Sequence, residues 1–177
     1  MSSPSSSTEP GPEHPSADTP LEVLRSWTLG FVAGLRSMMP LALLSAQLEH
    51  QGPDIADGGW ALDVLTSPWA ALALGVAAVG EVLADKLPFV PDRLEPASLA
   101  GRVVLGGTAS GLASLATGRA SDRGALLGSL GAIVGSVAGY SLRTTACRVW
   151  PGAVQSVLVA VSEDALAFAL GRWAVRT

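Results

Sequence analysis

Five ionisable side chains lie inside stretches of the chain that are otherwise apolar. They are Arg36, Glu81, Asp85, Glu163 and Asp164. A charge at the centre of a bilayer costs about 2.5–3.5 kcal/mol on insertion scales, so these residues need compensation. Two explanations stay open. The charges either pair with one another and lock helices together, or they form a polar site near the midplane for an ion, a proton or a charged head group.

The local spacing of these residues constrains how they can meet. Glu81 and Asp85 are four residues apart, which places them on one face of a helix. Glu163 and Asp164 are adjacent and point about 100° apart, so at most one of them faces a given partner. Pro40 follows Arg36 closely and lacks a backbone donor, which predicts a kink or an unwound segment near Arg36. For Arg36, both Glu81 and Asp164 are candidate partners.

The elements that position these residues are apolar segments close to the length of a membrane crossing. Five such segments are expected, at residues 26–48, 68–87, 99–117, 124–142 and 152–172. Charged residues make up 15% of the 177 residues, against about 25% in ordinary soluble domains, and mean hydropathy is +0.41. We therefore predict an all-α, polytopic integral membrane bundle of about five helices. The net charge of −4 excludes a basic nucleic-acid binder, and the single cysteine excludes a disulfide scaffold.

Domain organisation and orientation follow from the remaining charges. Residues 1–21 are rich in Ser and Pro, acidic and without Lys or Arg, which predicts a disordered tail before one transmembrane domain at 22–177. All five tryptophans fall near predicted span ends, where indole rings suit the membrane interface. With five crossings, six basic residues fall on the side of the N-terminus and four on the other side. This predicts a cytoplasmic N-terminus in the cell membrane and a C-terminus on the opposite side.

Small residues supply the packing surfaces. Glycines recur along the fourth segment with small-xxx-small spacing, which favours close helix contacts and a homo-oligomer. The sequence Gly-Phe-Val-Ala-Gly at 30–34 resembles Gly-Ser-Val-Ala-Gly at 135–139, and an arginine follows each. Spans one and two therefore form a possible inverted repeat with spans four and five, an arrangement in which transporters build sites from broken helices.

Other chemistry finds little support in the sequence. His14, His50 and Cys147 form no recognisable metal-ligand set, and no cofactor motif is present. Glu81 and Asp85 are an acid/base pair in principle, but nothing identifies a substrate beside them, which disfavours an enzyme. The proline-rich loop after the second span carries Lys86 and Arg93, as a rigid connector or as a gate over the acidic pair.

Several of these segments together resemble a known family. They are Gly-Leu-Arg-Ser-Met-Met-Pro at 34–40, Gly-Glu-Val-Leu-Ala-Asp-Lys-Leu-Pro at 80–88 with Pro-Asp-Arg at 91–93, Ala-Gly-Tyr at 138–140 and Glu-Asp-Ala-Leu-Ala at 163–167. This set resembles the bacterial membrane proteins grouped as domain of unknown function (DUF) 4126, over about residues 22–172. The resemblance implies a small polytopic membrane protein without an established activity, and it supplies no catalytic residues.

The leading functional hypothesis is a small transporter or channel-like protein whose midplane site is built from the five intramembrane charges. A second hypothesis is a non-transporting scaffold or lipid-binding membrane protein in which the same charges are structural pairs. A third is a lipid-phosphate enzyme in which Arg36 holds the phosphate. The partners expected are membrane lipid, further copies of the chain and a small ion or charged solute, and nucleic acid is not expected.

Overall fold

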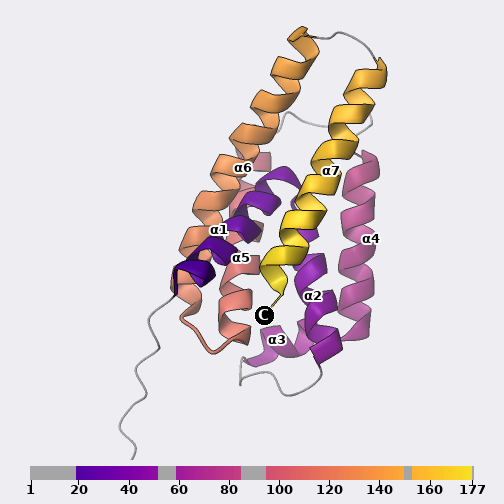
Figure 1. Cartoon of the computed structure of the whole chain (residues 1–177). Helices are drawn as coiled ribbons and strands as arrows, with labels where there is room; N and C mark the ends of the chain where they lie inside the picture. Colours follow the sequence, from indigo (N-terminus) through magenta and orange to yellow (C-terminus); the bar gives the residue numbers. More distant parts are fainter. Residues whose placement is uncertain (1–18, 52–58, 85–94, 150–152, 177) are drawn as a thin grey trace, which may run out of the picture.

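The computed structural model describes residues 19–51, 59–84, 95–149 and 153–176. Within these ranges the chain is helical and has no strand, which confirms the all-α prediction (Figure 1). The helices are α1 (Pro20–Leu35), α2 (Met39–Gln51), α3 (Gly59–Leu65), α4 (Pro68–Ala84), α5 (Pro96–Ala116), α6 (Ser121–Val149) and α7 (Ala153–Val175). Residues 1–18 of the predicted tail lie outside the described residues. Because Thr19 caps α1, the last two residues of that predicted tail are helical.

The first predicted span consists of two helices that form a hairpin. Helix α1 ends at Leu35, and Arg36 has an extended backbone with φ −143° and ψ 107°. The predicted break near Arg36 is therefore confirmed. Arg25, near the start of α1, and Gln51, at the end of α2, line the same cavity. Residues 26–48 thus return to the end of the bundle from which they start, in place of the single continuous span that was expected (Figure 1).

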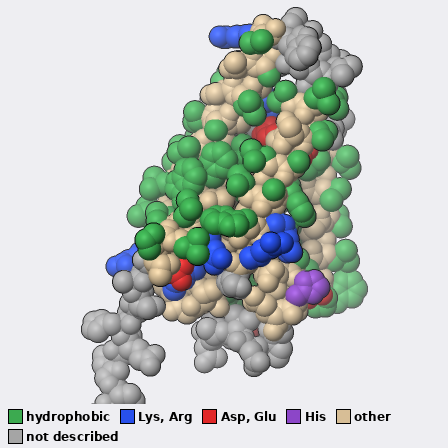
Figure 2. Space-filling model, viewed as in Figure 1, with side chains coloured by type: hydrophobic (Ala, Val, Ile, Leu, Met, Phe, Trp, Pro, Cys, Tyr) green, Lys and Arg blue, Asp and Glu red, His purple; other side chains and the backbone are tan. Residues whose placement is uncertain are grey.

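The two ends of the described chain lie at one end of the bundle. The guanidinium carbon of Arg25 is 6.0 Å from the ring centroid of Trp173, near the end of α7. The prediction that the C-terminus lies on the side opposite the N-terminus is wrong, because the α1–α2 hairpin adds a reversal of direction. In Figure 2, Lys and Arg side chains gather at this end, and hydrophobic side chains cover the middle of the visible face.

By length and composition, two of the described helical segments are apolar enough to cross a membrane, Pro96–Ala116 and Ser121–Ala146. Helices α3 and α4 would add a third crossing if they count as one span bent by 71°. These findings support a membrane bundle. Five crossings and the inverted repeat stay predictions, and α6 continues unbroken through Arg143, whereas α1 ends just before Arg36.

Glycine contacts hold α6 against both α1 and α5. A Cβ atom on Gly30 would collide with the backbone carbonyl of Gly128, and one on Gly135 would collide with that of Phe31. A Cβ on Gly128 would likewise meet the carbonyl oxygen of Gly106. The predicted small-residue packing is confirmed between helices of one chain.

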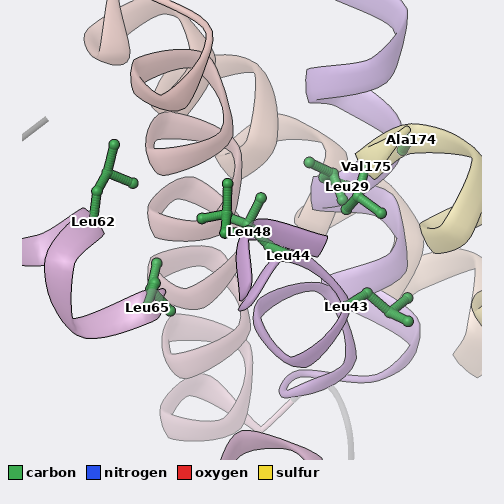
Figure 3. Packing of buried hydrophobic residues seen from close by; sticks show 8 residues of the cluster. All are labelled: Leu29, Leu43, Leu44, Leu48, Leu62, Leu65, Ala174 and Val175. Atoms are coloured by element: carbon green, nitrogen blue, oxygen red, sulfur yellow. The ribbon is translucent and has the colours of Figure 1, made fainter. Parts of the chain in front are cut away.

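A second contact region is built from leucines near the end that holds both termini. In Figure 3, Leu44 and Leu48 of α2 lie between the leucines of α3 and the α1 and α7 residues Leu29 and Val175. Helix α4 packs mainly against α2 and has no buried residue among its 17 residues. The bundle therefore has a tightly packed centre and one peripheral helix.

Candidate functional site

The break between α1 and α2 binds a carboxylate from α4. The backbone N–H groups of Ser37 and Met38 donate to the two carboxylate oxygens of Glu81, at 2.8 and 2.9 Å. The first N–H groups of a helix have no partner within it, and they form the positive end of the helix dipole. Ser37 and Met38 immediately precede α2, so the Glu81 carboxylate lies at the N-terminal end of that helix and satisfies both backbone donors through charge-assisted hydrogen bonds.

An arginine from α5 occupies the other side of the break. Arg102 Nη1 donates to the carbonyl oxygen of Gly34 at 2.7 Å and to that of Leu35 at 3.4 Å. These carbonyls belong to the last turn of α1, where a cation is favourable. Arg102 is only 8% exposed. The partially negative end of α1 thus meets Arg102, and the partially positive start of α2 meets Glu81.

Arg36 lies at the break itself and pairs with α7. Its Nε donates to Oδ1 of Asp164 at 2.5 Å. The Arg36 side chain is 2% exposed and the Asp164 side chain 17%. Of the two predicted partners, Asp164 is therefore the one that Arg36 uses through its side chain, and Glu81 binds the backbone of the residues that follow.

The neighbouring acid on α7 takes a different partner. Oε2 of Glu163 accepts a hydrogen bond from Nε of Arg143 on α6 at 2.9 Å. Glu163 is 1% exposed and Arg143 29%. Because adjacent helical residues diverge by about 100°, Glu163 and Asp164 reach two different arginines, as their spacing predicts.

The structure thus brings four of the five predicted intramembrane charges into one set of contacts among α1, α2, α4, α6 and α7. The fifth, Asp85, and the predicted connector residues Lys86 and Arg93 lie outside the described residues. The candidate charges expected from the sequence did not include Arg102 and Arg143. Arg102 interrupts the apolar run of the third predicted span, and that interruption was the available signal.

We define the break cluster as the three arginines and three acids that meet here. They are Arg36, Arg102, Arg143, Glu81, Glu163 and Asp164. Its formal charges balance, so the cluster as described is neutral. The described residues contain no group of three or more His, Cys, Asp or Glu side chains placed to hold a metal ion. The chemistry available is proton exchange at carboxylates and anion binding by backbone N–H groups and guanidinium groups.

Comparisons with curated proteins and with solved structures give no match. The sequence pattern of one family matches residues 23–177, which covers every helix from α1 to α7 except the first turn of α1. The helices with the composition of membrane spans agree with the implication of that family resemblance. The chain therefore belongs to the family described as domain of unknown function (DUF4126).

Proposed function

We propose that this chain is a small multi-pass membrane protein that couples proton movement to the movement of a small anion. One observation carries the proposal: two backbone N–H groups at the α1–α2 break hold the carboxylate of Glu81. Broken helices with half-helix ends directed at a bound charge are typical of transporter sites. Here the position of the anion is filled by a side chain that protonation can neutralise.

The proposed cycle begins with protonation of Glu81. A neutral carboxyl is a weaker acceptor, so the N–H groups of Ser37 and Met38 become available to an anion from solution. Arg36 and Arg102 lie beside the same break and add positive charge for that anion. When Glu81 loses its proton, its carboxylate returns to the N–H groups and displaces the anion. Asp164 orients Arg36 throughout.

The same proposal places the protein in the cell membrane with both described ends in the cytoplasm. The hairpin, the α3–α4 pair, α5, α6 and α7 are the five membrane elements. Arginines concentrate at the end that holds the start of α1 and the end of α7, namely Arg25, Arg119, Arg123, Arg172 and Arg176. A cytoplasmic location of this end follows the positive-inside rule. Assembly into a homo-oligomer stays a prediction.

Proteoliposomes test the proposal. Vesicles loaded with a pH-sensitive dye receive an outward proton gradient, with chloride, nitrate, phosphate or succinate as the only transported anion. We expect proton flux with at least one of these anions, loss of that flux in Glu81→Gln and Asp164→Asn, and normal flux in Glu49→Gln. Glu49 is an exposed acid at the far end of α2 and is the matched control. Flux retained in both site variants would overturn the site.

The second candidate is a scaffold in which the charges serve only to join helices. The observation that favours it is the balance of three arginines by three acids in the break cluster. In that case no anion supports flux, and removing both members of a pair preserves the fold. For the lipid-phosphate enzyme the structure adds no supporting observation, since the guanidinium expected to hold the phosphate is bound to Asp164.

A further inference from the structure

A cavity of about 80 Å³ lies at the end of the bundle where α1 begins and where α2, α5 and α7 end. A cavity needs a volume of roughly 10–15 Å³ to hold one water molecule, so this cavity has room for a group of several heavy atoms. Its polar lining includes Arg25, Arg119 and Gln47. None of these residues belongs to the break cluster, and only the cytoplasmic placement of this end rests on the proposed function.

Arg25 brings a buried donor to this cavity. Its Nε is buried and makes no hydrogen bond within the described part of the chain. Its guanidinium carbon lies over the ring of Trp173, 6.0 Å from the ring centroid, and this cation–π contact uses none of the guanidinium N–H donors. A buried donor without an acceptor is costly, which points to a ligand that supplies one.

Arg119 supplies a second guanidinium from the turn after α5. Its side chain is 10% exposed, and its Nε donates to Oγ1 of Thr117 at 2.8 Å. Oε1 of Glu22 lies 3.6 Å from the same Nε, so Arg119 forms an ion pair with this partly exposed acid but no hydrogen bond to it. The Thr117 bond uses one of the five N–H donors of the guanidinium, and the fork geometry of the others suits two oxygens of one phosphate.

Much of the remaining wall of the cavity is apolar, and a tryptophan lies beside it. Leu29, Leu48 and Val175 line it, and Trp173 lies beside it. Two cations over an apolar wall suit an anionic group attached to an apolar body. Basic pockets between transmembrane helices on the cytoplasmic side bind lipid head groups by this combination.

We propose that this cavity binds a phosphate ester, with Arg25 and Arg119 holding the phosphate oxygens and Gln47 binding a hydroxyl of the esterified alcohol. The ester has two possible sources, an anionic membrane lipid or a soluble phosphate ester of the same alcohol. Phosphatidylglycerol and sn-glycerol 3-phosphate represent these sources, and phosphatidylcholine with the same acyl chains represents a phosphate lipid whose net charge is zero.

Native mass spectrometry of the purified full chain, titrated with each probe, measures the affinity. We expect phosphatidylglycerol to bind at least about tenfold more tightly than phosphatidylcholine, and Arg25→Gln or Arg119→Gln to remove most of that preference. The control is Arg176→Gln, which removes an exposed charge at the same end of the bundle, outside the cavity lining. We expect it to change the affinity less than about twofold.

A cavity-filling variant keeps the test independent of charge. Ala113 lines the cavity, so Ala113→Phe should weaken phosphatidylglycerol binding with every arginine in place, and circular dichroism confirms the helical fold of each variant. Binding of sn-glycerol 3-phosphate alone would assign the site to a soluble ester. Equal binding of the two lipids with no binding of the soluble ester, or equal losses in Arg25→Gln and Arg176→Gln, would overturn the proposal.

Discussion

Helices α6 and α4 are both apolar, yet they join the bundle by different physical means. Helix α6 meets α1 and α5 through glycines, so closely that a Cβ on Gly30 would strike the backbone of Gly128. Helix α4 has no buried residue, and no atom from another described element lies within 4 Å of the position that a Cβ on Gly75 or Gly80 would take. Helix α4 is joined to the hairpin by hydrogen bonds from two backbone N–H groups to the carboxylate of Glu81.

This difference separates a fixed part of the molecule from a part that can move. Close backbone packing leaves α1, α5 and α6 a single arrangement, because any shift creates voids or collisions. Helix α4 has no buried residue, so we expect it to lose few buried contacts when it shifts, and we propose that the charge state of Glu81 controls its position. In this proposal α4 is the moving element, and α1, α5 and α6 form its frame.

The largest expected effect comes from enlarging a glycine in the frame. Gly30→Leu forces two helix backbones apart, and we expect it to prevent folding, since overpacking beyond a few kcal/mol consumes the stability of a typical domain. Gly75→Leu, the same change in open space on α4, should fold normally. Yield and monodispersity on size-exclusion chromatography measure both. Equal behaviour of the two variants would remove the distinction between frame and moving helix.

A smaller loss is expected from the ion pair between the hairpin and α7. Asp164→Leu takes the carboxylate away from Arg36, which is 2% exposed, and should cost about 3–5 kcal/mol in free energy of unfolding. Arg36→Leu combined with Asp164→Leu should recover most of this cost. Asp63→Leu, at an exposed acid of α3, is the control. A double variant as unstable as the single one would show that the pair is not what stabilises this junction.

Neutralising Glu81 should have a still smaller and more local effect. Glu81→Gln keeps one oxygen that still accepts from a backbone N–H group, so it removes about one charge-assisted hydrogen bond, or about 1.5–3 kcal/mol, and leaves the glycine packing intact. Hydrogen exchange followed by mass spectrometry should show faster exchange in α4 and at the start of α2, with α6 unchanged. Uniformly faster exchange across the bundle would contradict the separation of the two regions.

The smallest effect concerns the exposed start of α1. The backbone N–H of Thr19 donates to the Glu22 carboxylate at 2.8 Å and lowers the pKa of Glu22. This stabilisation is complete above the ordinary pKa of a glutamate and is lost as pH falls through the lower pKa of the folded state. By NMR titration, Thr19→Pro, which deletes the N–H, should raise the pKa of Glu22 more than Thr19→Ala does. An equal rise in both would assign the shift to the hydroxyl.

Much of the helical architecture could be predicted from the sequence. Apolar run length placed both ends of the later segments within three residues of α4 to α7, except that α6 ends seven residues later than expected, and Pro40 indicated the break near Arg36. Hydropathy records how long an apolar run is and says nothing of its direction in space. The reversal at the break depends on tertiary contacts of Arg102 and Glu81 with the two half-helix ends, and no local pattern encodes them.

The candidate site could be predicted only in part, because local sequence patterns do not encode tertiary contacts. Isolated charges in apolar runs identified Arg36, Glu81, Glu163 and Asp164, and the adjacency of the last two predicted that they would take separate partners. Arg143 looked like a loop charge because it follows the apolar part of its segment, yet α6 continues past it to Val149. Helix α3 was missed because seven residues are too few to show a periodicity.

The central claim is that protonation of Glu81 releases α4 from the hairpin. Pulsed electron paramagnetic resonance tests this claim by measuring the distance between two spin labels on the protein in lipid nanodiscs. The labels are attached at the exposed positions Val76 on α4 and Val134 on α6, and Cys147 is replaced by serine. We predict a longer α4–α6 distance in Glu81→Gln, in which the amide stands in for the protonated carboxyl, than in the wild-type chain at the same pH, and an unchanged distance in Glu49→Gln. Equal distances in Glu81→Gln and the wild-type chain would contradict the claim.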